Sequence, residues 1–184
     1  MKLRLLSIAA ALLAASTFTT AHAQVGIYGK FDGVHVSNSA TDNIVAKGWF
    51  VGGGGGLYFN FLHLGPLALG ADARGDFSSQ SPHNYRDVLF GVRVAAKAPV
   101  IPLRPYAQFS VGLGGPSYSG VGGGINYNNK FQYWVIGGVD HTIFPHVDWR
   151  IAELGYGRMS TVSSTPGPSI NLFSASTGIV VRFP

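Results

Sequence analysis

Charged residues recur at every second position in several otherwise apolar stretches of this sequence. Asp72, Arg74 and Asp76 alternate with alanine and glycine, and Lys30 and Asp32 flank Phe31 between Gly29 and Gly33. In an extended strand this spacing places the charges on one face and their neighbours on the other. The same reasoning places ten charges on one shared inner face: Lys30, Arg74, Arg93, Arg150 and Arg182 with Asp32, Asp72, Asp76, Asp140 and Glu153. Five cations and five acids predict a self-neutralising network, with an ion-conducting or proton-carrying path as the alternative.

Serine, histidine and glycine residues are the other candidates for catalysis and for metal or phosphate binding. Ser174 and Ser176 are expected at the inner face, whereas His141 and His146 flank a turn at the other end of the predicted strands, so no Ser-His-acid set forms. No histidine spacing matches a known metal motif. The glycine runs at 52–56 and 122–124 lack the Lys-Ser/Thr of a phosphate-binding loop. The sequence therefore predicts no catalytic residues, no metal site and no cofactor.

Eight stretches long enough to cross a membrane as tilted strands would position the charged face. They span residues 25–36, 49–61, 67–77, 85–96, 105–114, 131–141, 147–158 and 171–183. Long polar or glycine-rich connections at 37–48, 78–84, 115–130 and 159–170 alternate with short turns at 62–66, 97–104 and 142–146. This plan predicts an all-β fold, an eight-stranded antiparallel up-and-down transmembrane β-barrel with both termini on one side.

Two further features of the strands refine the barrel. Arg150 and Glu153 face inward together only if a β-bulge lies near Ala152. Aromatic residues are expected in two girdles at the membrane interfaces, with the filling of the lumen as the alternative for some of these rings. The girdles comprise Trp49, Tyr85, Phe131 and Tyr133 at the outer ends, and Phe59, Phe61, Tyr106, Phe144, Trp149 and Phe183 at the periplasmic ends. An eight-stranded interior is just wide enough for side chains to fill.

Both ends of the sequence carry export features. Lys2 and Arg4 precede a short apolar run, and a small-x-small site ends at Ala23, so residues 1–23 are predicted to be a signal peptide. The barrel domain then covers residues 24–184. At the other end, Ser176, Gly178, Val181 and Phe183 follow the spacing of a C-terminal signal for barrel insertion, and Pro184 is a one-residue tail.

Composition excludes several classes of function. Without Lys2 and Arg4 the net charge falls from +5 to +3 and no cluster of like charges remains, so nucleic acid is not an expected partner. The absence of cysteine excludes disulfides and thiolate metal sites. Only 11% of residues are charged while 26 are glycine, which is typical of a small lipid-facing sheet. No segment after the signal peptide has the apolar length of a transmembrane helix.

The sequence from residue 24 onward resembles the eight-stranded outer-membrane β-barrel family that includes the OmpA transmembrane domain and the opacity-type surface proteins. The likeness rests on the opening Val25-Gly-Ile-Tyr-Gly-Lys-Phe-Asp32, on Gly137-Gly-Val-Asp140, on Asp148-Trp-Arg-Ile-Ala-Glu-Leu-Gly-Tyr156 and on residues 176–183. The resemblance implies a monomeric barrel in the Gram-negative cell outer membrane. Its implied partners are membrane lipid, lipopolysaccharide and, during assembly, the barrel-insertion machinery.

Fold alone does not determine function. The sequence favours a non-enzymatic structural and surface-interaction barrel, with a salt-bridged lumen and outer loops that meet ligands. The alternatives are a narrow, porin-like pore for ions or small solutes and, with less support, a lipid-A-directed acyl hydrolase or acyltransferase.

Overall fold

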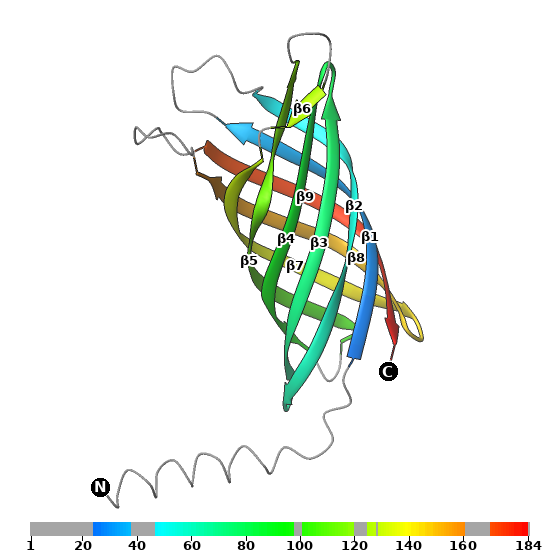
Figure 1. The fold of residues 1–184 in the computed structure, drawn as a ribbon. Helices are drawn as coiled ribbons and strands as arrows, with labels where there is room; N and C mark the ends of the chain where they lie inside the picture. The colour runs from blue at the N-terminus through cyan, green and yellow to red at the C-terminus, as the bar shows by residue number, and fades with distance from the viewer. Residues whose placement is uncertain are drawn as a thin grey trace, which may run out of the picture.

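The computed structural model describes residues 24–37, 47–97, 101–119, 125–127, 129–160 and 170–183. They form β1 (Gln24–Ser37), β2 (Gly48–Leu64), β3 (Leu67–Gln80), β4 (His83–Ala96), β5 (Leu103–Ser119), β6 (Ile125–Tyr127), β7 (Lys130–Phe144), β8 (Val147–Met159) and β9 (Ile170–Phe183). Eight long strands surround one axis, and the short β6 lies beside the far end of β5 (Figure 1).

The barrel is closed by antiparallel pairing throughout. The strand order is β4-β3-β2-β1-β9-β8-β7-β5, and the pairing of β4 with β5 joins the two edges. Val25 pairs with Phe183, so β1 begins beside the end of β9 (Figure 1). We call this end of the barrel the terminal end and the opposite end the distal end. The predicted eight-stranded all-β barrel is confirmed, and closure leaves no unpaired sheet edge among its strands.

The strands run farther than the sequence predicted, and two of the expected long connections are wrong. The segment 78–84 is mostly strand: β3 and β4 continue to a two-residue turn at Ser81 and Pro82, with Gln80 paired to His83. Likewise, β5 extends to Ser119 and pairs with β6 inside the segment expected to be a loop. Polar side chains there predict a loop, but side-chain polarity does not prevent a hairpin from continuing its backbone ladder.

At the terminal end the turns are tight. Gly65 and Pro66 connect β2 to β3, and Pro145 and His146 connect β7 to β8. Gly65 and His146 have φ values of 60° and 70°. This left-handed conformation is easy for glycine and uncommon for other residues. Glycine at position 65 is therefore explained by the turn.

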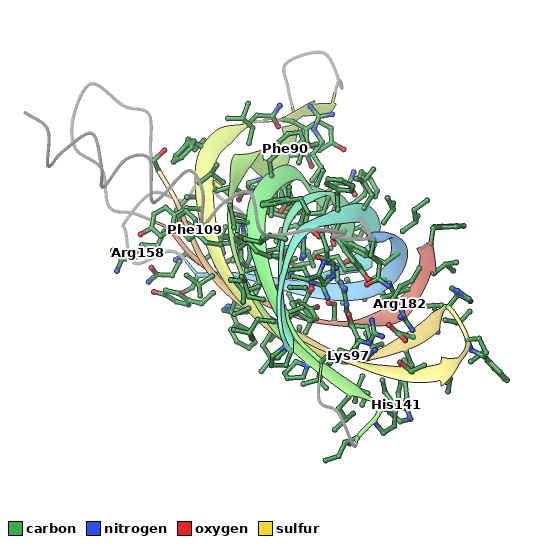
Figure 2. The ribbon with its side chains drawn as sticks, turned by 90° about the horizontal axis from the view of Figure 1, so that it is seen from below. Phe90, Lys97, Phe109, His141, Arg158 and Arg182 are labelled. Atoms are coloured by element: carbon green, nitrogen blue, oxygen red, sulfur yellow. The ribbon has the colours of Figure 1, made fainter. Side chains whose placement is uncertain are left out.

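The outer surface of the barrel is apolar along most of its length. Phe31, Phe90, Val135 and Leu154 are each more than half exposed, and Phe90 and Phe109 point away from the barrel in Figure 2. A water-facing sheet alternates apolar residues toward a core and polar residues outward. Here the alternation is reversed, which is the pattern expected of a sheet whose outer face contacts lipid.

The predicted bulge in β8 is confirmed. Asp140 pairs with Arg150 whereas Val139 pairs with Ala152, and the register with β9 also shifts between Arg150 and Glu153. Both Ile151 and Ala152 point outward. Arg150 and Glu153 are consequently both buried in the lumen.

Some sequence predictions concern residues outside the described ranges. These are the signal peptide at 1–23, the glycine triplet at 122–124, Pro184, and most of the connections at 37–48 and 159–170. Among the described residues, no helix has the length and apolarity needed to cross a membrane.

Candidate functional site

The middle of the lumen is organised around Glu153 on the bulged strand β8. Its Oε1 accepts hydrogen bonds from Arg74 Nη1 at 2.9 Å and from Ser176 Oγ at 3.2 Å. Its Oε2 accepts from Arg150 Nη1 at 3.0 Å and from the Tyr106 hydroxyl at 2.5 Å. A buried carboxylate is stable only when paired and fully hydrogen-bonded, and Glu153 meets both conditions.

Arg74 connects this carboxylate to the strands on the other side of the barrel. Its Nε donates to Asp72 Oδ1 at 3.0 Å, and its Nη2 donates to Gln108 Oε1 at 2.9 Å. The Tyr28 hydroxyl donates to both oxygens of Asp72. One guanidinium thus joins β3 to β5 and β8, which makes the network a cross-brace of the barrel.

Toward the terminal end, Asp140 binds two cations. Asp140 accepts from Arg93 Nη2 at 2.8 Å and from Arg150 Nε at 2.9 Å. The Arg93 guanidinium also lies between two aromatic rings, 4.2 Å from the Tyr58 centroid and 3.8 Å from that of Tyr106. Stacking of this kind suits arginine and offsets part of the cost of burial.

The remaining predicted network residues lie at the two ends of this cluster. Arg182 Nη2 donates to Asp148 Oδ1 at 2.9 Å near the terminal end. Lys30 Nζ lies 2.8 Å from Asp76 Oδ2, farther toward the distal end. Asp32 bonds only to the Ser78 hydroxyl, at 3.3 and 3.4 Å. All ten residues that the sequence placed inside are buried, but Asp32 has no cation within ion-pair distance among the described residues.

The predicted balance of five charges of each sign is wrong. Asp87 and Asp148 are also buried and Arg104 also faces inward, so seven acidic side chains face six cations in the described lumen. Asp148 alternates with Arg150 on β8, a signal the sequence contained. Asp87 stands next to Arg86, and two adjacent charges of opposite sign do not reveal which one faces inward.

Toward the distal end the lumen is mainly apolar, although Asp87 and Gln132 are buried there too, both within hydrogen-bond distance of the Tyr85 hydroxyl. A single buried cluster draws side chains from six barrel strands: Val34, Val36, Phe50, Tyr85, Leu89, Trp134, Ile136, Met159, Ile170 and Leu172. Tyr85 and Tyr106 are both buried inside the lumen, so for these two rings the girdle prediction is wrong and the alternative, filling of the lumen, holds. An aromatic ring suits a membrane interface and a packed core equally well, so its position on the strand decides which of the two it joins.

Glycines on adjacent strands leave space for several of the buried rings, each glycine being the direct partner of its ring in the strand register. A side chain at Gly56 would meet Tyr28, one at Gly138 would meet Tyr106, and one at Gly157 would meet Trp134. In β2, Gly56 leaves space for the Tyr28 ring, which comes from the adjacent strand β1 and not from across the lumen. A side chain at Gly52 or Gly54 would instead meet the neighbouring strand β3.

A cavity of about 280 Å³ lies at the terminal end of the lumen. Tyr58, Asn60, Arg93, Arg104 and Asp140 are among the residues that line it, and Lys97 lies at its mouth. Viewed from below in Figure 2, Lys97 and Arg182 lie toward this end of the barrel. Along the barrel axis the lumen therefore has three parts: a terminal cavity, a charged middle and an apolar distal plug.

No catalytic constellation forms among the described residues. Ser176 bonds to Glu153, Ser78 to Asp32, and His83 Nδ1 lies 3.2 Å from the Ser117 carbonyl oxygen. No described serine hydroxyl bonds to a histidine, and no group of His, Asp and Glu side chains in those ranges is arranged to hold a metal ion.

The four residues of the proposed assembly signal lie on β9. Val181 and Phe183 point outward, 39% and 47% exposed, while Ser176 faces the lumen and Gly178 packs closely on β1 at Lys30. Their role in insertion stays a prediction.

Comparison with solved structures shows the same barrel in outer-membrane proteins. Neisserial surface protein A matches with a TM-score of 0.57 at 18% identity, over 88% of this chain and 97% of that one. Ail, the attachment invasion locus protein of Yersinia pestis, matches with a TM-score of 0.57 at 11% identity, over 87% and 98%. The outer membrane enzyme PagL matches with a TM-score of 0.54 at 11% identity, over 85% and 99%.

These likenesses establish the fold, which is that of the eight-stranded outer-membrane β-barrels. No family model and no curated protein sequence matches the chain. The fold accommodates surface proteins and an enzyme, so function has to be argued from the side chains.

Proposed function

We propose that residues 24–184, after removal of a signal peptide at 1–23, form a monomeric, non-enzymatic barrel in the outer membrane of a Gram-negative cell. In this orientation the terminal end faces the periplasm and the distal end faces the outside. The protein acts as a structural and surface-interaction protein that binds lipopolysaccharide, the phosphate-bearing lipid of the outer leaflet, at its distal rim.

The observation that carries this proposal is the separation of charge between the inside and the outside of the barrel. All seven described acids lie in the lumen. The exposed charges of the described ranges are all cations: Lys47, Arg86, Lys97 and Arg158. An outer surface whose described part carries cations and no carboxylate attracts anionic headgroups.

Two of these cations, Arg86 on β4 and Arg158 on β8, lie near the distal ends of their strands. The Arg86 guanidinium stacks on the Tyr127 ring of β6 at 3.7 Å, and Arg158 pairs across the sheet with Tyr133. Aromatic rings favour the headgroup level of a membrane, and an arginine held there forms bidentate hydrogen bonds with phosphate. We call Arg86 and Arg158 the rim pair.

The distal plug supports an interaction role over transport. Ten buried apolar side chains from six strands pack across the lumen, and the charged middle is cross-braced below them. Ion passage needs a polar path, whereas an apolar constriction of packed rings excludes water. A narrow pore is therefore the weaker candidate.

Lipopolysaccharide binding is tested by thermal unfolding of the refolded chain in an uncharged detergent. Added lipopolysaccharide raises the unfolding temperature of the wild-type chain, because a ligand that binds only the folded state stabilises it. The Arg86→Gln/Arg158→Gln double variant loses most of that shift, and lipid A stripped of its phosphates gives none. An equal shift in the double variant contradicts the proposal.

A further inference from the structure

The terminal cavity differs from the rest of the lumen in its charge. Three cationic side chains line it, Arg93, Arg104 and Lys97, against a single carboxylate, Asp140. Elsewhere in the described lumen the acids outnumber the cations. The excess of positive charge thus coincides with an empty space of about 280 Å³.

The carboxylate of Asp140 is already occupied by other partners. Its Oδ2 accepts from Arg93 and its Oδ1 accepts from Arg150, both within 2.9 Å. Both oxygens therefore hold a charged donor. Asp140 cannot fully compensate a third cation beside it.

Arg104 is that third cation. It pairs with Asp140 across β5 and β7 in the strand register, yet no ion pair joins them, and no described carboxylate lies within 4.0 Å of its guanidinium. The side chain is only partly exposed and faces the cavity, so water compensates it incompletely. A guanidinium in this position gains from an anionic ligand that supplies the missing oxygens.

The lining adds neutral hydrogen-bonding groups beside the charges. Asn60 is buried and contributes an amide to the wall, and Tyr58 contributes a ring and a hydroxyl. A mixed wall with few convergent polar groups is the usual composition of a small-molecule site. The volume of about 280 Å³ is at the lower limit of such sites, which suits a compact ligand.

We propose that the terminal cavity binds a small soluble oxyanion, a carboxylate or a phosphate, with Arg104 as its main charged contact. The anion enters from the terminal end, because the mouth is formed by strand ends and turns there, including His63, Gly65, Pro66 and Lys97. The closed strand ladder separates the cavity from the membrane lipid. This site is independent of the distal rim, so it stands whether or not the rim binds lipopolysaccharide.

Titration of the refolded, isotopically labelled chain with inorganic phosphate, and separately with citrate, tests the site. The chain is held in an uncharged detergent at low ionic strength, and backbone amide shifts are followed by NMR. We expect a saturable response of Asn60, Arg93 and Arg104 to at least one of the two anions. The anion that gives the tighter saturation identifies the ligand as a phosphate or a carboxylate.

Three variants separate specific binding from general attraction. Arg104→Gln weakens the binding by about tenfold or more, since a charge-assisted hydrogen bond is lost. Arg104→Lys, which keeps the charge, retains most of it and shows that the barrel tolerates change at this position. Lys47→Gln removes the same charge far from the cavity and leaves the affinity within about twofold, as expected of a distant screened charge.

Two results overturn the proposal. One is the lack of any saturable shift around the cavity with both anions. The other is an equal loss of affinity in Arg104→Gln and Lys47→Gln, which would mean that the anions respond only to the net charge of the barrel.

Discussion

The distal and terminal halves of the lumen are built by the same strands but closed by different chemistry. In the distal half, Phe50, Trp134 and Leu172 are fully or almost fully buried among apolar neighbours. In the other half, Arg74, Arg150 and Glu153 are buried to the same degree among charges. The apolar cluster borders a gap of only about 10 Å³, whereas the charged half ends in a cavity of about 280 Å³.

The difference shows what each kind of packing contributes. Apolar side chains fill space in many equivalent ways, so the plug depends on volume and tolerates exchange of one apolar residue for another. Charged side chains are stable in the lumen only in particular geometries, because each unpaired group carries a large desolvation cost. The charged half therefore fixes the relative positions of strands, and its empty space is bounded by groups that cannot collapse into it.

The largest expected effect comes from neutralising the centre of the charged half. Glu153→Gln keeps the shape of the side chain but leaves Arg74 and Arg150 short of a carboxylate, and should lower the free energy of unfolding by about 3–5 kcal/mol. Urea unfolding of the refolded barrel in lipid vesicles measures it. Ser176→Ala, which removes one hydrogen bond to the same carboxylate, is the matched control and should cost about 1 kcal/mol. Similar small losses in both would show that the network does not hold the strands.

Shortening an apolar side chain in the distal plug is the counterpart of neutralising Glu153. Leu172→Ala creates a cavity among apolar side chains and should lower the free energy of unfolding by about 2–5 kcal/mol. Leu172→Met, close in volume, should cost less than about 1.5 kcal/mol. The comparison breaks down if methionine is as damaging as alanine, because the plug would then depend on a fixed shape, as the charged half does.

The outer face provides a third environment, in which charge should be harmful for a different reason. Ile179→Arg places a cation in the lipid-facing belt and should cost roughly 2–4 kcal/mol in the same vesicle assay. Thr177→Ser, also outward on β9, should change the stability little. An unaffected Ile179→Arg barrel would mean that the facing of β9 is wrong.

The smallest effect is expected at the distal rim. Arg158→Gln should leave the intrinsic stability nearly unchanged, since an exposed charge contributes little to folding. Unfolding in detergent free of lipopolysaccharide measures it. A loss as large as that of Glu153→Gln would place Arg158 in a structural network and remove it from the proposed rim pair.

The sequence was sufficient to predict the barrel because the alternation of inward and outward residues is a local property. Asp72, Arg74 and Asp76 alternate with small residues, and the spacing of Arg150 and Glu153 required a bulge that β8 contains. The hairpin at Ser81 and Pro82 was missed because polar side chains do not distinguish a loop from a strand in water.

The pairing inside the lumen was not readable from the sequence. Arg74 and Glu153 are 79 positions apart and meet only because the barrel closes. Asp87 was missed beside Arg86, and the lone position of Arg104 depends on Asp140 turning toward Arg93 and Arg150. Contacts of this kind follow from closure and register, which alternation alone does not determine.

Single-channel recording of the refolded wild-type chain in planar bilayers tests the central claim most directly. That claim is that the distal plug closes the lumen and leaves it open only at the terminal end. We predict no steady openings across the range of voltages that the bilayer withstands. Steady openings whose conductance shifts when Arg93 or Arg150 is replaced by glutamine would contradict it, because ions would then be passing both the charged middle and the plug.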